Sequence, residues 1–146
     1  MEAQKRDEIN LSGEEMSRYA RHLSLPEIGI IGQKHLKASS VLCIGSGGLG
    51  SPLLLYLAAA GIGHIGIVDF DFVEDSNLQR QVIHGMNWIG QPKIDSARAR
   101  ILELNPYCQV NTFRTRLSSK NAIDIINKFD VVCDCTDNFP SRYLIN

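Results

Sequence analysis

The chain has 146 residues and a formal net charge of −1, enough for one domain with its own core and small for two. Hydrophobic residues make up 44% and charged residues 21%, as in an average soluble globular chain. A net charge this close to zero gives no indication of nucleic acid or an anionic membrane as a partner. The start, MEAQKRDEIN, lacks the apolar core of a signal peptide, and PLLLYLAAAGIG is too short to span a bilayer. We therefore expect a cytoplasmic protein.

The four cysteines, at positions 43, 108, 133 and 135, include no CxxC pair. Cys133 and Cys135 alternate along an expected strand, so they share one face without being adjacent. That arrangement suits neither a disulfide nor a tetrahedral zinc site. We interpret the cysteines as small buried hydrophobic residues in a reducing compartment.

Strand-like and helix-like segments alternate along the chain. The expected strands cover 41–45, 64–70, 108–115 and 130–136, and the expected helices cover 12–23, 32–39, 51–60, 75–84, 93–104, 118–126 and 139–146. This alternation predicts the α/β class, with a doubly wound, mostly parallel, Rossmann-like sheet that carries helices on both faces. An N-terminal helical segment precedes the sheet.

We divide the chain into a flexible N-terminus at 1–10, a helical segment at 11–40 and a nucleotide-binding domain at 41–146. The sequence ends inside the helix expected directly after the fourth strand, and nothing after Asn146 closes the sheet. We therefore expect this domain to be incomplete at its C-terminal end and the chain to be part of a longer protein.

The first helix has a recognisable start, because Ser12 and Glu15 have the spacing of a capping box. Its apolar residues recur with helical spacing at Met16, Tyr19, Ala20 and Leu23. This stripe is expected to face the core, which leaves Arg18 and Arg21 on a more exposed side.

A glycine-rich turn follows the first expected strand. Residues 45–50, GSGGLG, satisfy G-x-G-x-x-G between a strand and a helix. Gly45 permits the tight turn, Gly47 and Gly48 let a ligand approach the backbone, and Gly50 allows close packing of helix and strand. The free N–H groups at the start of the next helix favour an anion.

Asp69 ends the second expected strand, where a dinucleotide-binding fold places the acid that holds ribose hydroxyls. The glycine turn and Asp69 together predict a nucleotide site without identifying the nucleotide. A tight strand–helix turn with no ligand is the alternative, and the position of Asp69 makes it the weaker one.

Cations near this expected site indicate a polyphosphate. Arg80 follows the second strand, and Lys93 begins a helix, where a lysine opposes the helix dipole. Asp137 and Asn138 follow the fourth strand. Open parallel sheets bind ligands outside the carboxyl ends of their strands, so these side chains are expected to meet at one edge.

Five segments resemble the adenylation domain of the MoeB/ThiF family, whose members are related to ubiquitin-activating enzymes. In chain order they are RYARHLSLPEIGIIGQ, GSGGLGSP, DFDFVEDSNLQRQ, GQPKIDSARARI and DCTDNFPSRY. The resemblance runs from about Leu11 to Asn146, and it is nearer the branch that activates the sulfur carrier of molybdopterin synthase than the thiamine branch.

The resemblance implies an adenylyltransferase reaction. ATP and Mg²⁺ activate the C-terminal Gly-Gly carboxylate of a small ubiquitin-like sulfur-carrier protein, giving an acyl-adenylate and pyrophosphate. A carboxylate is ionised at pH 7, so no general base is needed, and none is evident in the sequence. The barrier is the approach of two anions, which fixed cations and a metal lower.

The resemblance also implies roles for individual residues. The positions that match ATP-binding residues are Gly48, Asp69, Ser76, Asn77, Leu78, Gln79, Arg80, Lys93, Asp137 and Asn138. Asp137 is the expected Mg²⁺ ligand. The expected catalytic residues are Arg21, Arg80, Lys93 and Asp137, of which Arg21 matches an arginine delivered from the other subunit of a homodimer.

Several of these residues have simpler interpretations. Arg18 and Arg21 fit a solvated helix face on the sequence alone, and only the resemblance favours a catalytic role for Arg21. Asp137 could cap the helix that follows it. Asp71 stays open between a structural and a ligand-binding role, and the four histidines are interpreted as structural or surface residues.

Features expected of the parent protein lie beyond residue 146, namely the structural zinc site with its CxxC pairs and the cysteine of later sulfur chemistry. We expect this chain alone to be inactive, with no nucleic-acid or membrane partner. The alternative functions are a non-catalytic nucleotide-binding Rossmann module, an NAD-dependent oxidoreductase, and a family relative that adenylates a small-molecule or tRNA-linked carboxylate.

Overall fold

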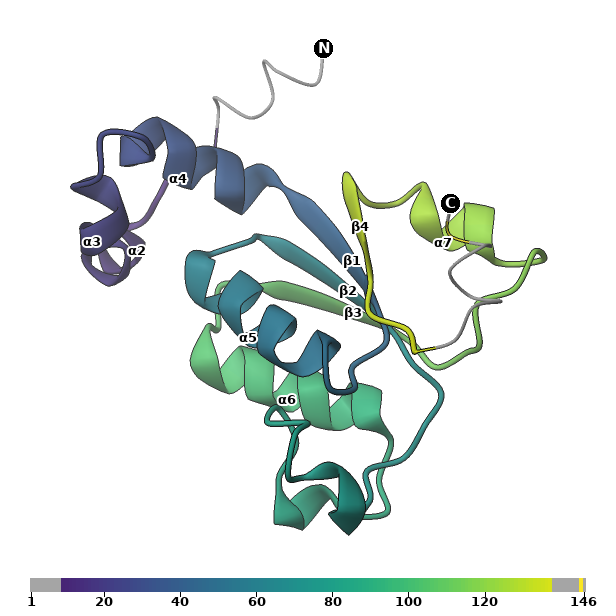
Figure 1. The fold of residues 1–146 in the computed structure, drawn as a ribbon. Helices are drawn as coiled ribbons and strands as arrows, with labels where there is room; N and C mark the ends of the chain where they lie inside the picture. Colours follow the sequence, from purple (N-terminus) through teal and green to yellow (C-terminus); the bar gives the residue numbers. More distant parts are fainter. Residues whose placement is uncertain (1–8, 138–144, 146) are drawn as a thin grey trace.

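A parallel sheet of four strands forms the centre of the molecule (Figure 1). The computed structural model describes residues 9–137 and 145. Within these ranges the strands are β1 (Ser40–Ile44), β2 (His64–Val68), β3 (Gln109–Phe113) and β4 (Val131–Asp134). Their order across the sheet is β3-β2-β1-β4, and every neighbouring pair is parallel. The expected α/β, doubly wound, Rossmann-like class is confirmed.

The helices cover both faces of this sheet. They are α2 (Gly13–Arg18), α3 (Ala20–Leu23), α4 (Gly29–Ala38), α5 (Gly50–Ala60), α6 (Lys93–Leu104) and α7 (Ala122–Ile126). The chain passes from β1 through α5 to β2 and through α6 to β3, then returns past α7 to β4 beside β1 (Figure 1). Right-handed crossovers that change direction in this way place their helices on opposite faces.

Side chains of β1 point alternately to the two faces. Val41 and Cys43 are buried in a cluster that includes residues of α5 and α6, whereas Leu42 and Ile44 are buried in a second cluster with residues of α7. Gly66 of β2 is needed on the second face, because a Cβ there would lie 2.3 Å from the Phe129 ring. The core is therefore two apolar layers that share one sheet.

Four expected helices differ from the observed ones, and the one expected over 32–39 starts earlier, at Gly29. The helix expected over 12–23 is divided at Tyr19 into α2 and α3. The segment 75–84 forms a 3-10 turn at Asp75–Asn77, capped by Glu74 and Asn77, and continues as turns in place of an α-helix. The helix expected over 118–126 starts at Ala122, since Asn121 Oδ1 accepts from Ser118 and forms a turn first. The helix expected over 139–146 lies, apart from Ile145, outside the described residues.

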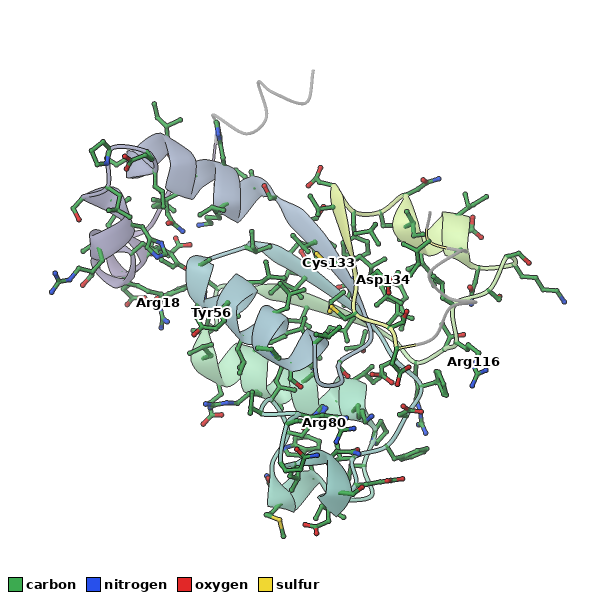
Figure 2. The ribbon with its side chains drawn as sticks, in the orientation of Figure 1. Arg18, Tyr56, Arg80, Arg116, Cys133 and Asp134 are labelled. Carbon is green, nitrogen blue, oxygen red and sulfur yellow. The ribbon has the colours of Figure 1, made fainter. Side chains whose placement is uncertain are left out.

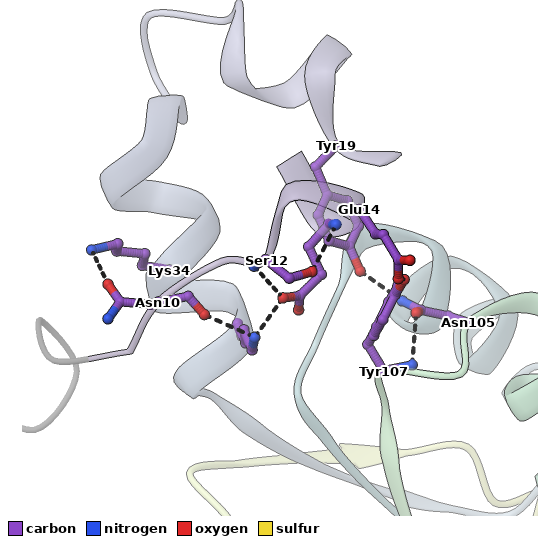
Figure 3. A network of polar contacts seen from close by, with 9 residues as sticks. Asn10, Ser12, Glu14, Tyr19, Lys34, Asn105 and Tyr107 are labelled. Atoms are coloured by element: carbon purple, nitrogen blue, oxygen red, sulfur yellow. Dashed lines mark hydrogen bonds and ion pairs between the residues drawn. The ribbon is translucent and has the colours of Figure 1, made fainter. Parts of the chain in front are cut away.

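The N-terminal helices are attached to the rest of the fold by polar contacts (Figure 3). Asn105 is fully buried, and its amide donates to the Tyr19 hydroxyl and to the Ala58 carbonyl, each at 2.7 Å.

The capping box of Ser12 and Glu15 is confirmed. The expected apolar stripe is partly wrong, since Met16 and Ala20 are exposed. Glu15 is buried in their place, where it accepts from Lys37 at 2.7 Å.

The most apolar stretch of the sequence forms α5, as expected for a buried helix. Leu54 and Ala58 are fully buried, and Gly61 ends the helix with a φ of 86°. Among residues 9–137 and 145, no helix combines the length and the apolar character that a membrane span requires.

The cysteines are free thiols. Cys43 and Cys108 are buried, which confirms their interpretation as small hydrophobic residues, whereas Cys133 and Cys135 are only half-buried. Burial raises the pKa of Cys108 to about 11, so this thiol stays protonated at neutral pH.

Candidate functional site

A cavity of about 480 Å³ lies at the carboxyl edge of the sheet. Residues that follow all four strands line it, at 45, 47–49, 69–71, 115–117 and 135–137. The strand order reverses beside β1, because β2 and β3 lie on one side of it and β4 on the other, so this edge is the topological switch point, where open α/β sheets bind ligands. The elements of the fold therefore bring the expected strand-end residues to one place.

The glycines of the turn have different functions. Gly45 has a φ of 96°, which L-residues rarely adopt. A Cβ on Gly50 would lie 2.0 Å from the Gly45 carbonyl oxygen, so only glycine lets α5 start this close to β1. A Cβ on Gly48 would meet the Arg80 side chain at an ordinary 3.7 Å. Gly45 and Gly50 thus shape the turn, whereas Gly48 lines the cavity beside Arg80 and could carry a Cβ without a clash.

Hydrogen bonds hold this turn in place from two sides. The backbone N–H and the hydroxyl of Ser46 donate to Asp69 Oδ2, at 2.8 and 2.7 Å. The carbonyl of Ser46 lies 3.2 Å from His84 Nε2 and also accepts from the Ser51 hydroxyl at 3.1 Å. Because a carbonyl only accepts, Nε2 carries the proton, and Nδ1 then accepts from Ser96 Oγ at 3.0 Å. The turn is fixed by the protein itself.

Asp69 lies at the end of β2, as expected, and lines the cavity. It is buried, and its Oδ1 accepts the backbone N–H of Asp71 at 2.9 Å. Each carboxylate oxygen can accept more than one hydrogen bond, so Oδ1 keeps capacity for a ligand hydroxyl. Asp69 therefore fastens the turn, a function that the sequence did not indicate, and remains available to a ligand.

The two cations expected from the sequence border the cavity. The Arg80 side chain is exposed and lies over Gly48, with Nη1 donating to the Ser76 carbonyl at 3.3 Å (Figure 2). Lys93 is buried at the start of α6, and its Nζ lies 3.4 Å from Asp71 Oδ2. The Asp71 side chain is 53% exposed, so this ion pair is open to exchange with a stronger anion.

Not all of the expected ATP-binding residues line the cavity. Gly48, Asp69, Arg80, Lys93 and Asp137 do. The remaining described ones, which the cavity lining does not include, are Ser76, Asn77, Leu78 and Gln79. These four form the turn from which Arg80 projects, and the Ser76 carbonyl holds its guanidinium. Asn138 lies outside the described residues.

Arg21 lies far from the cavity of its own chain. It belongs to α3, and its neighbour Arg18 donates to the Leu104 carbonyl at the C-terminal end of α6. Lys93 lines the cavity from the other end of α6, and a helix of 12 residues is about 18 Å long. Arg18 and Arg80 are correspondingly well separated in Figure 2. Arg21 is thus at the opposite edge of the sheet.

Several cavity residues were not identified from the sequence. They are Phe70, Gln81, Thr115, Arg116 and Leu117. The guanidinium of Arg116 lies 4.5 Å from the centre of the Phe70 ring, a cation–π contact at the cavity wall. The rule that ligands bind beyond the strand ends would have included the segment after β3, because 115–117 follows that strand.

The described part of the chain contains no group of three or more His, Cys, Asp or Glu side chains that could hold a metal ion. Asp137 is exposed and lines the cavity after β4. A divalent ion beside it would take most of its ligands from a bound phosphate and water, which is the usual mode of Mg²⁺.

The fold agrees with comparisons to known proteins. Residues 19–146 match the ThiF family, and this chain belongs to that family. It is 56% identical over 136 residues to a probable adenylyltransferase/sulfurtransferase MoeZ of Mycobacterium tuberculosis, covering 93% of this chain and 35% of that protein. It is 57% identical over 133 residues to a probable molybdopterin-synthase adenylyltransferase of Porphyra purpurea, covering 91% and 35%.

Solved structures agree on the fold. The tRNA N6-threonylcarbamoyladenosine dehydratase TcdA of E. coli is 26% identical, with a TM-score of 0.87, over 94% of this chain and 57% of that one. TcdA has also been solved in complex with ATP. This chain spans about a third of the length of the curated relatives it matches.

Because His84 holds the glycine turn, stability should depend on its protonation. Burial lowers the pKa of His84, and the hydrogen bond to Ser46 opposes this only in part. The unfolded state therefore binds a proton more readily, and the free energy of unfolding should fall as pH drops from about 7.5 through the ordinary His pKa of about 6.5 toward the lowered one. Thermal unfolding of the wild type and of His84→Gln, measured across this range, tests the prediction.

The His84→Gln variant should be less stable at pH 7.5 and should lose less stability on acidification than the wild type. Burial also lowers the pKa of His64, so a smaller pH dependence remains in the variant. An unchanged pH dependence after the substitution would mean that His84 does not contribute.

Proposed function

We propose that the protein to which this chain belongs adenylates the C-terminal Gly-Gly carboxylate of a small ubiquitin-like sulfur-carrier protein in the cytoplasm. It would use ATP and Mg²⁺ and release pyrophosphate, as a step in molybdopterin cofactor or related sulfur-transfer biosynthesis. One observation carries the proposal: a single cavity is bordered by the glycine turn, Arg80, Lys93 and Asp137. Family membership supports the same reaction class.

The cavity has the groups that a nucleoside triphosphate requires. The N–H groups of the turn and the start of α5 suit phosphate oxygens, and Gly48 has no side chain between the backbone and the cavity that it lines. Arg80 and Lys93 would neutralise the phosphates, with Lys93 exchanging Asp71 for the ligand. Asp69 Oδ1 would accept from a ribose hydroxyl. The four residues from Ser76 to Gln79 would support Arg80 rather than touch the phosphates.

The proposed reaction requires the site to stabilise negative charge. The attacking carboxylate is already ionised, so the site needs no base to activate it. Its approach to the α-phosphate brings two anions together and builds negative charge, which the fixed cations Arg80 and Lys93 would stabilise. Their positions on the rim and at the start of α6 are set by the fold, so little reorganisation is needed during the reaction.

Mg²⁺ would be bound beside Asp137, with Asn138 next to it. The metal supplies further charge neutralisation at the phosphates. A structural zinc site, expected beyond residue 146, would belong to the rest of the parent protein.

Sequence identity favours a sulfur carrier as the substrate. Relatives named as molybdopterin-synthase adenylyltransferase or as adenylyltransferase and sulfurtransferase are 49–57% identical to this chain. TcdA, whose name refers to tRNA, is 25–26% identical, and an E. coli MccB solved with MccA is 27% identical. A tRNA-linked or peptide carboxylate is therefore the second candidate.

A non-catalytic module would leave Arg80, Lys93 and Asp137 without a function.

The position of Arg21 supports a homodimer. Its own chain keeps it at the opposite edge of the sheet from the cavity, so a catalytic Arg21 would have to act on the cavity of a second subunit. A two-fold dimer can exchange such residues between two sites. Met16 lies on α2 and Leu25 lies just after α3. Both are exposed and offer apolar surface for the dimer contact.

Replacing Asp137 by alanine should nearly abolish ATP–pyrophosphate exchange by the full-length protein with a Gly-Gly carrier. The loss expected for one electrostatic group is about 2.7–4 kcal/mol of transition-state stabilisation. Asp124→Ala, which removes an exposed carboxylate of α7 away from the cavity, should retain exchange. Near-normal exchange by Asp137→Ala with Mg²⁺ would reduce Asp137 to a helix cap, and no exchange by the wild type with any Gly-Gly carrier would contradict the proposed substrate.

Mixing two inactive full-length variants tests the homodimer. Arg21→Ala and Asp137→Ala subunits should together recover about a quarter of wild-type activity, because random reassortment gives half mixed dimers with one intact site each. Each variant alone is the control. Absence of recovery, with subunit exchange demonstrated by mass spectrometry, would show that Arg21 does not act across a dimer.

A further inference from the structure

Gln81 is a buried polar side chain at the cavity with an unpaired atom. Its side chain lines the cavity, and the residue is 4% exposed. Among the described residues, its Oε1 is buried and has no hydrogen-bond partner. Its carboxamide lies beside the glycine turn, with Nε2 3.7 Å from the position that a Cβ on Gly47 would take.

Such an atom needs an explanation, because an unpaired buried polar group destabilises a fold. Gln33 gives the comparison within the same chain. It is also fully buried, but its Oε1 lies 2.9 Å from His22 Nδ1 and its Nε2 donates to the Ala60 carbonyl at 2.9 Å. Both polar atoms of the Gln33 carboxamide are therefore paired, whereas Oε1 of Gln81 is not.

We propose that the carboxamide of Gln81 binds a phosphate group of the nucleotide in this cavity. The inference deepens the proposed function and rests on its nucleotide. Gln81 follows Arg80 in sequence, and the two side chains lie beside Gly47 and Gly48, where the free N–H groups of the turn favour an anion. A half-turn of the carboxamide exchanges its oxygen and nitrogen, so it can present its N–H₂ to a phosphate oxygen, which only accepts.

Gln81 would be a neutral hydrogen-bond donor to the phosphate, and its function would differ from that of the cations Arg80 and Lys93. Arg80 is exposed and Lys93 is already paired with Asp71, whereas Gln81 is held in the wall by its burial. Its backbone N–H bonds to the Asn77 carbonyl at 2.9 Å, so the turn that carries Arg80 also fixes the start of the Gln81 side chain. Gln81 is thus placed to orient a phosphate that Arg80 and Lys93 attract.

Calorimetric titration of the full-length protein with ATP and with adenosine tests the proposal. Gln81→Met keeps the shape of the side chain and removes its polar atoms. It should weaken ATP binding about tenfold or more, since a hydrogen bond to a charged group is lost, and leave adenosine binding unchanged. Without nucleotide, its Tm should be equal to or above that of the wild type.

Gln33→Met is the matched control. It should lower the Tm, because His22 and Ala60 lose their partner, and leave ATP binding within about twofold of the wild type. If Gln81→Met does not fold, Gln81→Glu replaces it, and the added negative charge should weaken ATP binding more than adenosine binding.

Wild-type affinity for ATP in Gln81→Met would overturn the proposal, and so would an equal loss for ATP and adenosine, which would assign the carboxamide to the nucleoside. A wild-type protein that binds no ATP would instead overturn the proposed function, and this inference with it.

Discussion

The hydrogen bonds between Ser46 and Asp69 are the contact on which the site depends. They join the turn after β1 to the end of β2. The pairing of these two neighbouring strands alone would leave the loops beyond them unconstrained. His84 and Ser51 hold the other side of the same residue. The N-terminus of α5 is therefore aimed at the cavity by the protein, and a bound anion would find its N–H groups already in position.

This arrangement explains how an acid can lie beside a proposed phosphate site. Asp69 accepts three hydrogen bonds from the protein, which spread its charge over Ser46 and Asp71. Asp71 in turn faces Lys93, so the carboxylates and the buried ammonium offset one another in the absence of a ligand. A triphosphate would compete with Asp71 for Lys93, and its own charge would replace the exposed carboxylate. Lys93 would therefore have an anionic partner both without and with the nucleotide.

The sequence predicted what depends on local pattern. The alternation of helices and strands, the glycine turn and the positions of Asp69, Arg80 and Asp137 at the cavity followed from periodicity and from the rule that ligands bind at the carboxyl edge. Long-range pairing was not predictable. The burial of Glu15 depends on Lys37, and the structural role of His84 depends on Ser46, 38 residues away in sequence. Gln81 was missed because nothing in its neighbours shows that it lacks a partner.

The central claim is that the cavity at this sheet edge binds ATP with its phosphates against the glycine turn. A crystal structure of the full-length protein with a non-hydrolysable ATP analogue and Mg²⁺ tests it most directly. We predict density for the triphosphate beside Gly48, with Arg80 and Lys93 in contact with it and Lys93 moved away from Asp71. Nucleotide density in another part of the molecule, or phosphates that point to solvent while Lys93 stays paired with Asp71, would contradict the account.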